Sequence, residues 1–160
     1  MLTTVSQSTT INAPVKLVMQ SFYDIENWSS WSQLCTRANF LTESEWDNNS
    51  KFLMSISLSP LPITLTNIFT ITDPLGLPQD SIEWSAKKFG IESKHFWQLK
   101  EIQPNVTQID SVETITGTSL LLFIPLGISL VIKYLNYKWI RDLKKTAEHA
   151  FKRTNNSKSL

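Results

Sequence analysis

Apolar and polar residues alternate with a period of two through the middle of the chain, a pattern typical of β-strands that bury one face. Between Phe52 and Leu58, for example, every second residue is apolar. Residues rich in Pro and Gly interrupt the alternation and indicate a loop, most clearly over residues 73–78. We therefore predict strands over about residues 33–42, 51–58, 63–72, 81–86, 94–102 and 107–116.

The N-terminal part predicts one more strand and two short helices. Residues 2–11 are rich in Thr, Ser and Val, as strands often are. Asn12-Ala13-Pro14 is typical of a helix start, because Asn can cap free backbone N–H groups and Pro is tolerated in the first turn. Apolar residues then mark one face of a short helix that ends near Tyr23, and a second helical turn is expected over residues 25–30.

The C-terminal part shows the period of an amphipathic helix over residues 128–152. Its apolar stripe consists of Ile128, Ile132, Leu135, Trp139, Leu143, Ala147 and Phe151. Strands joined by tight turns are antiparallel, and one amphipathic helix covers one face of a sheet. The order of elements therefore predicts an α+β fold: an antiparallel sheet of about seven strands, two short helices after the first strand, and one long helix at the end.

The length and composition fit one globular domain. The chain has 160 residues, of which 41% are hydrophobic and 18% charged, and its formal net charge is +1. We assign residues 1–152 to this domain and residues 153–160 to a polar C-terminal tail. A net charge so close to zero gives no footprint for a phosphate backbone, so a nucleic-acid partner is disfavoured.

The sequence predicts neither a metal site nor a cofactor. A single cysteine, Cys35, excludes an intrachain disulfide, and no Cys or paired His stands near it. Nucleotide fingerprints and phosphate-binding glycine loops are missing from the sequence as well. The first residues lack the basic region and the apolar run of a signal peptide, which makes a cytoplasmic location the expectation.

One apolar segment begins at Leu120 and ends at Ile132. It is shorter than the roughly 20 residues that span a bilayer, and Pro125 and Gly127 interrupt it, so no transmembrane segment is predicted. A buried loop that leads into the core helix is one interpretation. Peripheral contact with a membrane, or with a protein partner, is the other.

Four short motifs occur in order along the chain: INAPVKLV (residues 11–18), DIENWSSW (24–31), SKHFWQL (93–99) and ETITG (113–117). They are similar to I-x-A-P-x-x-x-V, D-x-x-x-W-x-x-W, G-x-H-x-F-x-L and E-x-F-x-G in the SRPBCC superfamily, which includes START-like, polyketide cyclase/dehydrase and lipid-transport proteins. The resemblance covers the chain from about Val5 to Phe151. It implies a helix-grip fold, in which a curved sheet wraps around the C-terminal helix and an apolar cavity lies between them.

Polar residues share the apolar face of some predicted strands. His95 shares a face with Trp97, and Glu113 with Ile115. Because their strands are sequential, His95 and Glu113 could lie near each other, where an ion pair would favour the charged forms and burial would oppose them. A structural buried pair, a contact with a ligand's carbonyl or hydroxyl, and acid/base catalysis all stay open. Tyr23 is the third candidate for a catalytic role.

The resemblance implies binding or carriage of an apolar small molecule, such as a lipid, a polyketide or an isoprenoid. A polyketide cyclase or dehydratase is the alternative, and a module that docks on a partner or a membrane is the second alternative. The tryptophans could line a cavity or close it by packing into the core. The predicted ligand-binding residues are Asn67, Phe69, Trp84, His95, Trp97, Glu113, Leu135 and Trp139.

Overall fold

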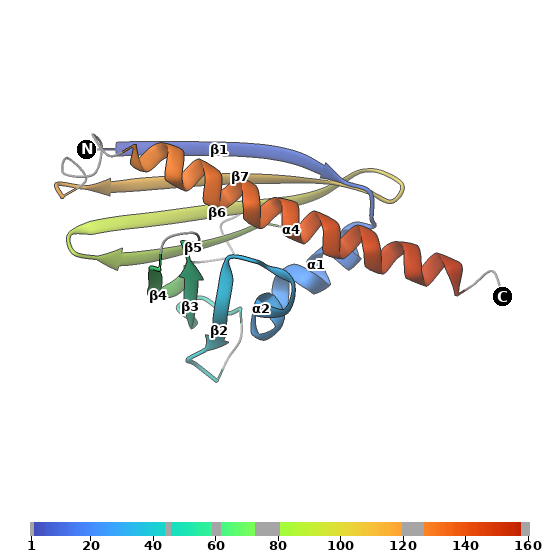
Figure 1. The fold of residues 1–160 in the computed structure, drawn as a ribbon, viewed down its shortest axis with the longest axis horizontal. Coiled ribbons are helices and arrows are strands. Elements are labelled where there is room, and N and C mark those ends of the chain that lie inside the picture. Colours follow the sequence, from blue (N-terminus) through green and yellow to red (C-terminus); the bar gives the residue numbers. More distant parts are fainter. Residues whose placement is uncertain (1, 44–45, 59–61, 73–80, 120–126, 158–160) are drawn as a thin grey trace.

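The computed structural model of the chain describes residues 2–43, 46–58, 62–72, 81–119 and 127–157. This part forms a curved sheet and one long helix that crosses it (Figure 1). The loop predicted over residues 73–78 lies outside the described residues, as does most of the apolar segment between Leu120 and Ile132.

Seven strands of the described residues form one antiparallel sheet, as predicted. Its order is β1-β7-β6-β5-β4-β3-β2, so β1 pairs with the last strand and every other strand pairs with its neighbour in the sequence. The strands are β1 (Leu2–Ile11), β2 (Cys35–Phe40), β3 (Lys51–Ser57), β4 (Thr64–Thr72), β5 (Ser81–Lys88), β6 (Ile91–Gln103) and β7 (Val106–Gly117).

The helices also follow the predicted order. The α-helix α1 (Val15–Tyr23), the 3₁₀ turn η1 (Ile25–Asn27) and the α-helix α2 (Trp28–Trp31) connect β1 to β2. Pro14 occupies the N-cap position of α1 and no side chain caps the helix, so the capping role expected for Asn12 is wrong. Asn12 instead donates its backbone N–H to Glu148 Oε1 at 2.9 Å.

The long helix α4 (Ile128–Asn156) continues four residues beyond the predicted end at residue 152. Thr154 donates its hydroxyl to the Ala150 carbonyl at 3.0 Å, and the Ser157 N–H donates to the Arg153 carbonyl at 3.1 Å. Residues 153–156 are polar but include no Pro or Gly, which would break a helix. The positive charge of Arg153 in the last turn stabilises the negative end of the helix dipole. The first residues of the predicted polar tail are therefore helical.

The hairpin between β5 and β6 is tighter than the sequence pattern predicted. The strands predicted over residues 81–86 and 94–102 leave residues 87–93 between them, but Lys88 pairs directly with Ile91 and only Phe89 and Gly90 form the turn. Both turn residues have positive φ angles, 52° and 74°, which match the right-handed twist of the flanking strands. The turn lies at one end of the sheet, where Ile91 pairs with Gly117 at the end of β7 (Figure 1).

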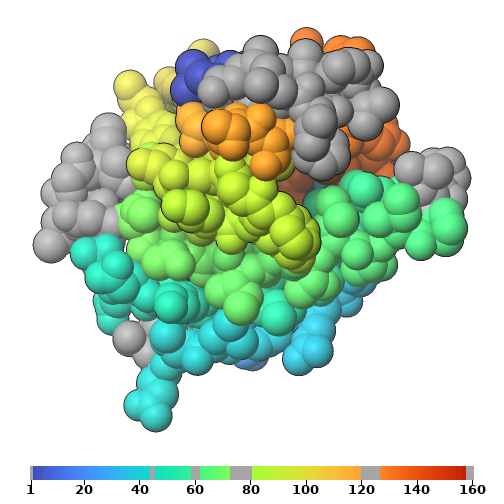
Figure 2. All heavy atoms as spheres, turned by 90° about the vertical axis from the view of Figure 1, so that its left-hand side faces the viewer, coloured from blue at the N-terminus to red at the C-terminus, as the bar shows by residue number. Residues whose placement is uncertain are grey.

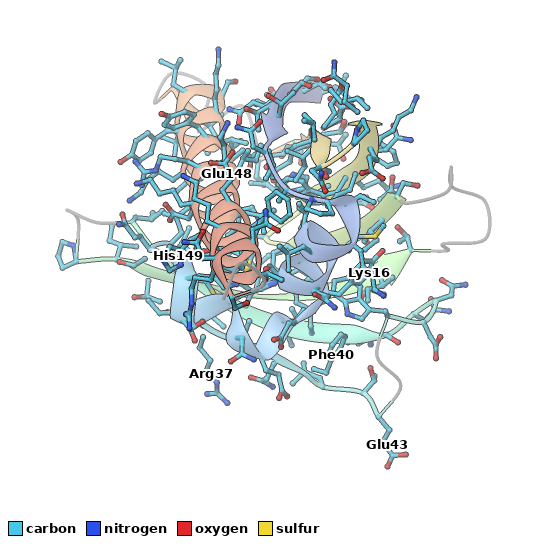
Figure 3. The ribbon with its side chains drawn as sticks, turned by 90° about the vertical axis from the view of Figure 1, so that its right-hand side faces the viewer. Lys16, Arg37, Phe40, Glu43, Glu148 and His149 are labelled. Carbon is cyan, nitrogen blue, oxygen red and sulfur yellow. The ribbon has the colours of Figure 1, made fainter. Side chains whose placement is uncertain are left out.

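The space between the sheet and the C-terminal half of α4 is filled by the short helices. Val18 and Phe22 of α1 and Trp28 of α2 are fully buried there, against Leu143 and Ala147 of α4. Figure 3 shows this end, with α1, which carries Lys16, beside the part of α4 that carries Glu148 and His149. We call this region the closed half of the molecule.

Candidate functional site

At the other end, a cavity of about 440 Å³ lies between the sheet and the first turns of α4. Figure 2 views this end, where the surface is hollowed between β4, the β5–β6 hairpin and the start of α4. Among the described residues, the cavity walls come from strands β3 to β7 and from α4 between Ile128 and Trp139, but from none of the short helices. Leu34, Leu58 and Phe89, which lie outside these elements, complete the lining. We call this region the open half.

Strand alternation and helix spacing together direct side chains into the cavity. On β6, Ile91, Ser93, His95 and Trp97 all line it, because every second residue of a strand faces the same side. All eight predicted ligand-binding residues belong to the lining: Asn67, Phe69, Trp84, His95, Trp97, Glu113, Leu135 and Trp139. Their contact with a ligand stays a prediction.

A polar cluster lies on one wall of the cavity. His95 and Glu113 are paired across β6 and β7, with 3.8 Å between His95 Nδ1 and Glu113 Oε2, so their predicted proximity is confirmed. The hydroxyl of Ser93 donates to Glu113 Oε1 at 2.9 Å, and Asn136 Nδ2 donates to Glu113 Oε2 at 3.1 Å. Ser111 Oγ lies 2.8 Å from His95 Nε2. Glu113 is thus held from the sheet and from the helix at once.

The electrostatics of the cluster decide the charge of His95. Burial lowers the pKa of His95 to about 4, against the smaller opposing effect of the Glu113 carboxylate. His95 is therefore neutral near pH 7, and the carboxylate does not gain a cationic partner from it. Desolvation, which favours the neutral form of His95, is therefore larger than the attraction of the Glu113 carboxylate, which favours the charged form.

The tryptophans of the cavity wall belong to the closed half as well. Trp139 lines the cavity and also packs edge-on against the buried Trp28, with 4.8 Å between the two ring centroids. Trp97 packs edge-on against Phe22 at 5.4 Å, and Trp84 packs against Phe22 at 5.8 Å. The cavity therefore ends where this aromatic cluster begins, and the same side chains serve both as its floor and as core.

Tyr23, the third catalytic candidate, is not brought to the cavity. Its ring packs edge-on against Trp46 at 4.9 Å between centroids, and the Trp46 indole N–H donates to the Tyr23 carbonyl at 2.8 Å. Because Tyr23 is the last residue of α1, it belongs to the closed half. The described structure gives no support for its catalytic role.

Sequence reasoning missed three members of the polar cluster: Ser93, Ser111 and Asn136. The signal for each was present, because Ser93 and Ser111 have the same parity as His95 and Glu113 on their strands. Asn136 interrupts the apolar stripe of α4, four residues after Ile132. It is buried, and a buried amide needs hydrogen-bond partners.

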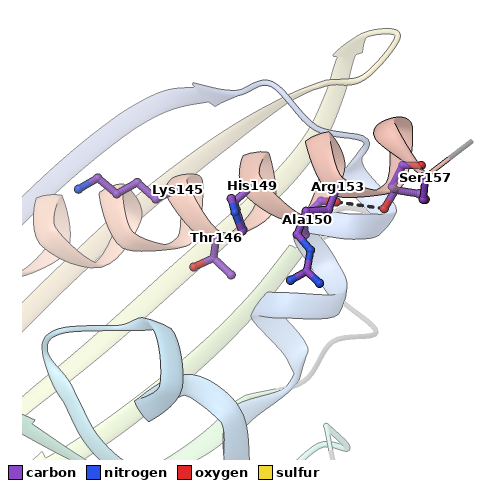
Figure 4. Close-up of a pocket in the computed structure, with 7 residues that line it drawn as sticks. Lys145, Thr146, His149, Ala150, Arg153 and Ser157 are labelled. Carbon is purple, nitrogen blue, oxygen red and sulfur yellow. Dashed lines mark hydrogen bonds between the residues drawn. The ribbon is translucent and has the colours of Figure 1, made fainter. Parts of the chain in front are cut away.

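A second hollow follows the C-terminal part of α4, but its walls all come from that one helix (Figure 4). Lys145, Thr146, His149 and Arg153 are among its lining residues, and it is open to solvent. This hollow is part of the solvent-exposed face of α4, and we assign it no role.

Other site chemistries find no support within the described ranges. They contain no group of three or more His, Cys, Asp or Glu residues placed to hold a metal ion. Cys35 is buried, and burial raises the pKa of its thiol to about 11, so the thiol is not activated. None of the described helices has the length and apolar character needed to cross a membrane.

The sequence matches no protein-family model and no curated protein. Solved structures, in contrast, share its fold over nearly the whole chain. The Zhui aromatase/cyclase from Streptomyces sp. R1128 has a TM-score of 0.72 and 13% identity, covering 92% of this chain and 94% of that chain. A START superfamily protein from Mycobacterium smegmatis has a TM-score of 0.69 and 13% identity, covering 94% and 98%.

The di-domain ARO/CYC StfQ from the steffimycin biosynthetic pathway has a TM-score of 0.69 and 15% identity, and this chain covers 52% of it. At such low identities the likeness concerns the fold. The chain has the SRPBCC/START-like helix-grip fold: a seven-stranded antiparallel sheet around a long C-terminal helix. The fold implied by the four sequence motifs is confirmed.

Proposed function

We propose that this protein binds an apolar small molecule, such as a lipid, a polyketide or an isoprenoid, in the cavity between the sheet and α4. The observation that carries the proposal is a cavity of about 440 Å³ walled mainly by apolar side chains, with one polar cluster. Its volume lies within the usual range of small-molecule sites, about 300–1,000 Å³. Apolar walls with a few convergent polar groups suit a ligand that is mostly hydrocarbon.

A cyclase or dehydratase is the second candidate, because His95 and Glu113 both line the cavity. The aromatase/cyclases among the similar folds make this chemistry worth testing. However, a histidine with a pKa of about 4 is a weak base near pH 7, and Ser111 already occupies its Nε2 atom. We therefore favour binding without turnover.

The environment-sensitive dye N-phenyl-1-naphthylamine tests the proposal, because its fluorescence rises in an apolar site. Ala86 lines the cavity, so Ala86→Phe should reduce its volume and weaken dye binding about tenfold or more. Ser85→Phe is the matched control, because the preceding residue on β5 faces the other side of the sheet. Circular dichroism verifies that both variants fold.

The binding proposal fails if the dye shows no saturable binding to the wild type. It also fails if Ala86→Phe and Ser85→Phe leave the affinity equally unchanged, because the dye would then bind elsewhere. Dye binding that Ala86→Phe alone weakens supports the cavity as the site.

A further inference from the structure

The carboxylate of Glu113 is the main hydrogen-bond acceptor of the polar cluster. It lines the cavity, and its side chain is 16% exposed. Each of its oxygens already accepts one hydrogen bond, from Ser93 and from Asn136. A carboxylate offers about four acceptor positions, so about two are not used by any residue that the structure describes.

The cluster holds no positive charge to balance that carboxylate. Among the described residues, His95 is the basic group within 4.0 Å of Glu113, and burial keeps it neutral near pH 7. Lys88 is the one Lys or Arg among the described lining residues. It lies at the exposed tip of the hairpin, where its ammonium donates to the Thr66 carbonyl at 3.0 Å. A buried carboxylate without a cation is costly unless hydrogen-bond donors surround it.

Two donors of the cluster, the Ser93 hydroxyl and one N–H of the Asn136 amide, are directed to Glu113 itself. The Ser93 hydroxyl has one proton, which Glu113 accepts, and Asn136 Nδ2 also donates to Glu113. A ligand carbonyl would compete with the carboxylate for these protons, and a ligand carboxylate would add a second negative charge beside the first. A ligand hydroxyl or amine would supply the proton that the free acceptor positions can take.

Building on the proposed binding function, we infer that the cavity selects apolar molecules whose polar group is a hydrogen-bond donor, an alcohol or an amine, accepted by Glu113. Carboxylic acids and molecules with acceptors alone bind more weakly. Trp84, Trp97 and Trp139 form the adjacent wall, and their aromatic faces suit either an apolar body or the positive charge of an ammonium group.

A series with one alkyl chain and different head groups tests the inference. 1-Dodecanol, dodecylamine, methyl dodecanoate and dodecanoic acid are each used to displace N-phenyl-1-naphthylamine from the wild-type protein at pH 7. We expect the alcohol and the amine to bind about tenfold more tightly than the ester and the acid, as one hydrogen bond to a charged group would give. The ratio of alcohol to amine then tells whether the preferred donor is neutral or cationic.

Glu113→Gln should remove the preference and leave the four affinities within about threefold of one another, because an amide both donates and accepts. Glu92→Gln is the matched control, since Glu92 lies on β6 between two lining residues and faces the other side of the sheet. If Glu113→Gln does not fold, Ser93→Ala serves instead. It frees a further acceptor position on Glu113, so it should widen the preference about threefold.

The inference is overturned if the ester or the acid displaces the dye as well as the alcohol and the amine do. It is equally overturned if the dye binds but none of the four compounds displaces it, or if Glu113→Gln, or Ser93→Ala in its place, leaves the preference unchanged. Absence of dye binding has a different meaning, because it removes the proposed function itself and the inference with it.

Discussion

The two halves of this molecule use the same sheet and the same helix with different results. In the closed half, α1 and α2 fill the space between them, and Phe22 and Trp28 are fully buried. In the open half no short helix intervenes among the described residues, and a cavity of about 440 Å³ takes that place. A sheet that curves around one helix encloses more space than the helix fills, so other elements decide whether that space is core or cavity.

The residues of α4 differ between the halves in the corresponding way. Ala147 is fully buried beside α1, where its small side chain permits close packing. Asn136, about three turns closer to the N-terminus, is also buried, but its amide donates a hydrogen bond to the carboxylate of Glu113. We infer that the closed half supplies most of the stability, whereas the open half contains polar groups that a tightly packed core would avoid.

The largest effect is expected from truncating the core of the closed half. Phe22→Ala should lower the free energy of unfolding by about 3–5 kcal/mol, because it removes a fully buried ring and leaves a void. Phe69→Ala in the open half should cost only about 1–2 kcal/mol, because that ring is half-buried and already borders the cavity. Urea denaturation of both variants measures the difference; equal losses would contradict the division into two halves.

A smaller effect is expected from the neutral histidine of the open half. The pKa of His95 is about 4 in the folded protein and near 6.5 when exposed, so between these values the unfolded state binds more protons. Stability should therefore fall as the pH decreases from 6.5 toward 4, by up to about 3 kcal/mol from this group.

The comparison of wild type with His95→Gln isolates this contribution, because carboxylates titrate in both proteins. The free energy of unfolding of wild type minus that of His95→Gln should decrease steadily from pH 7 to pH 4.5, because only the wild type loses the contribution of neutral His95. His149→Gln, on the exposed face of α4, is measured in parallel as the control for a histidine-to-glutamine substitution outside the cavity. If the free energy of unfolding of wild type minus that of His95→Gln stays the same from pH 7 to pH 4.5, His95 is not buried in its neutral form.

The smallest effect is expected at the tip of the β5–β6 hairpin, at the margin of the open half. Phe89 is 83% exposed and adopts a φ of 52°, which Asn accepts more readily than an aromatic residue. Phe89→Asn should leave the fold intact and raise the free energy of unfolding by a few tenths of a kcal/mol. Thermal and urea denaturation measure it, and a loss above about 1 kcal/mol would mean that Phe89 packs against the protein.

Much of the architecture could be predicted because it depends on local patterns. The strand predicted over residues 2–11 from its Thr, Ser and Val content coincides with β1 residue for residue, and the parity of His95 and Glu113 placed both on the cavity side. The β5–β6 hairpin was less predictable, because Phe-Gly is not among the common sequences for a turn with two positive φ angles. The register of the neighbouring strands holds this turn in place.

The cavity and the charge of its polar cluster required the tertiary structure. The sequence by itself determined the order of elements, the faces of the strands and the apolar stripe of α4, since these follow from the periods of strands and helices. Only the packed structure decided how far α1 and α2 reach along α4, and therefore which tryptophan faces border empty space. It alone also decided that His95 is neutral, because desolvation depends on every group that surrounds the ring and not on the residues next to it in the sequence.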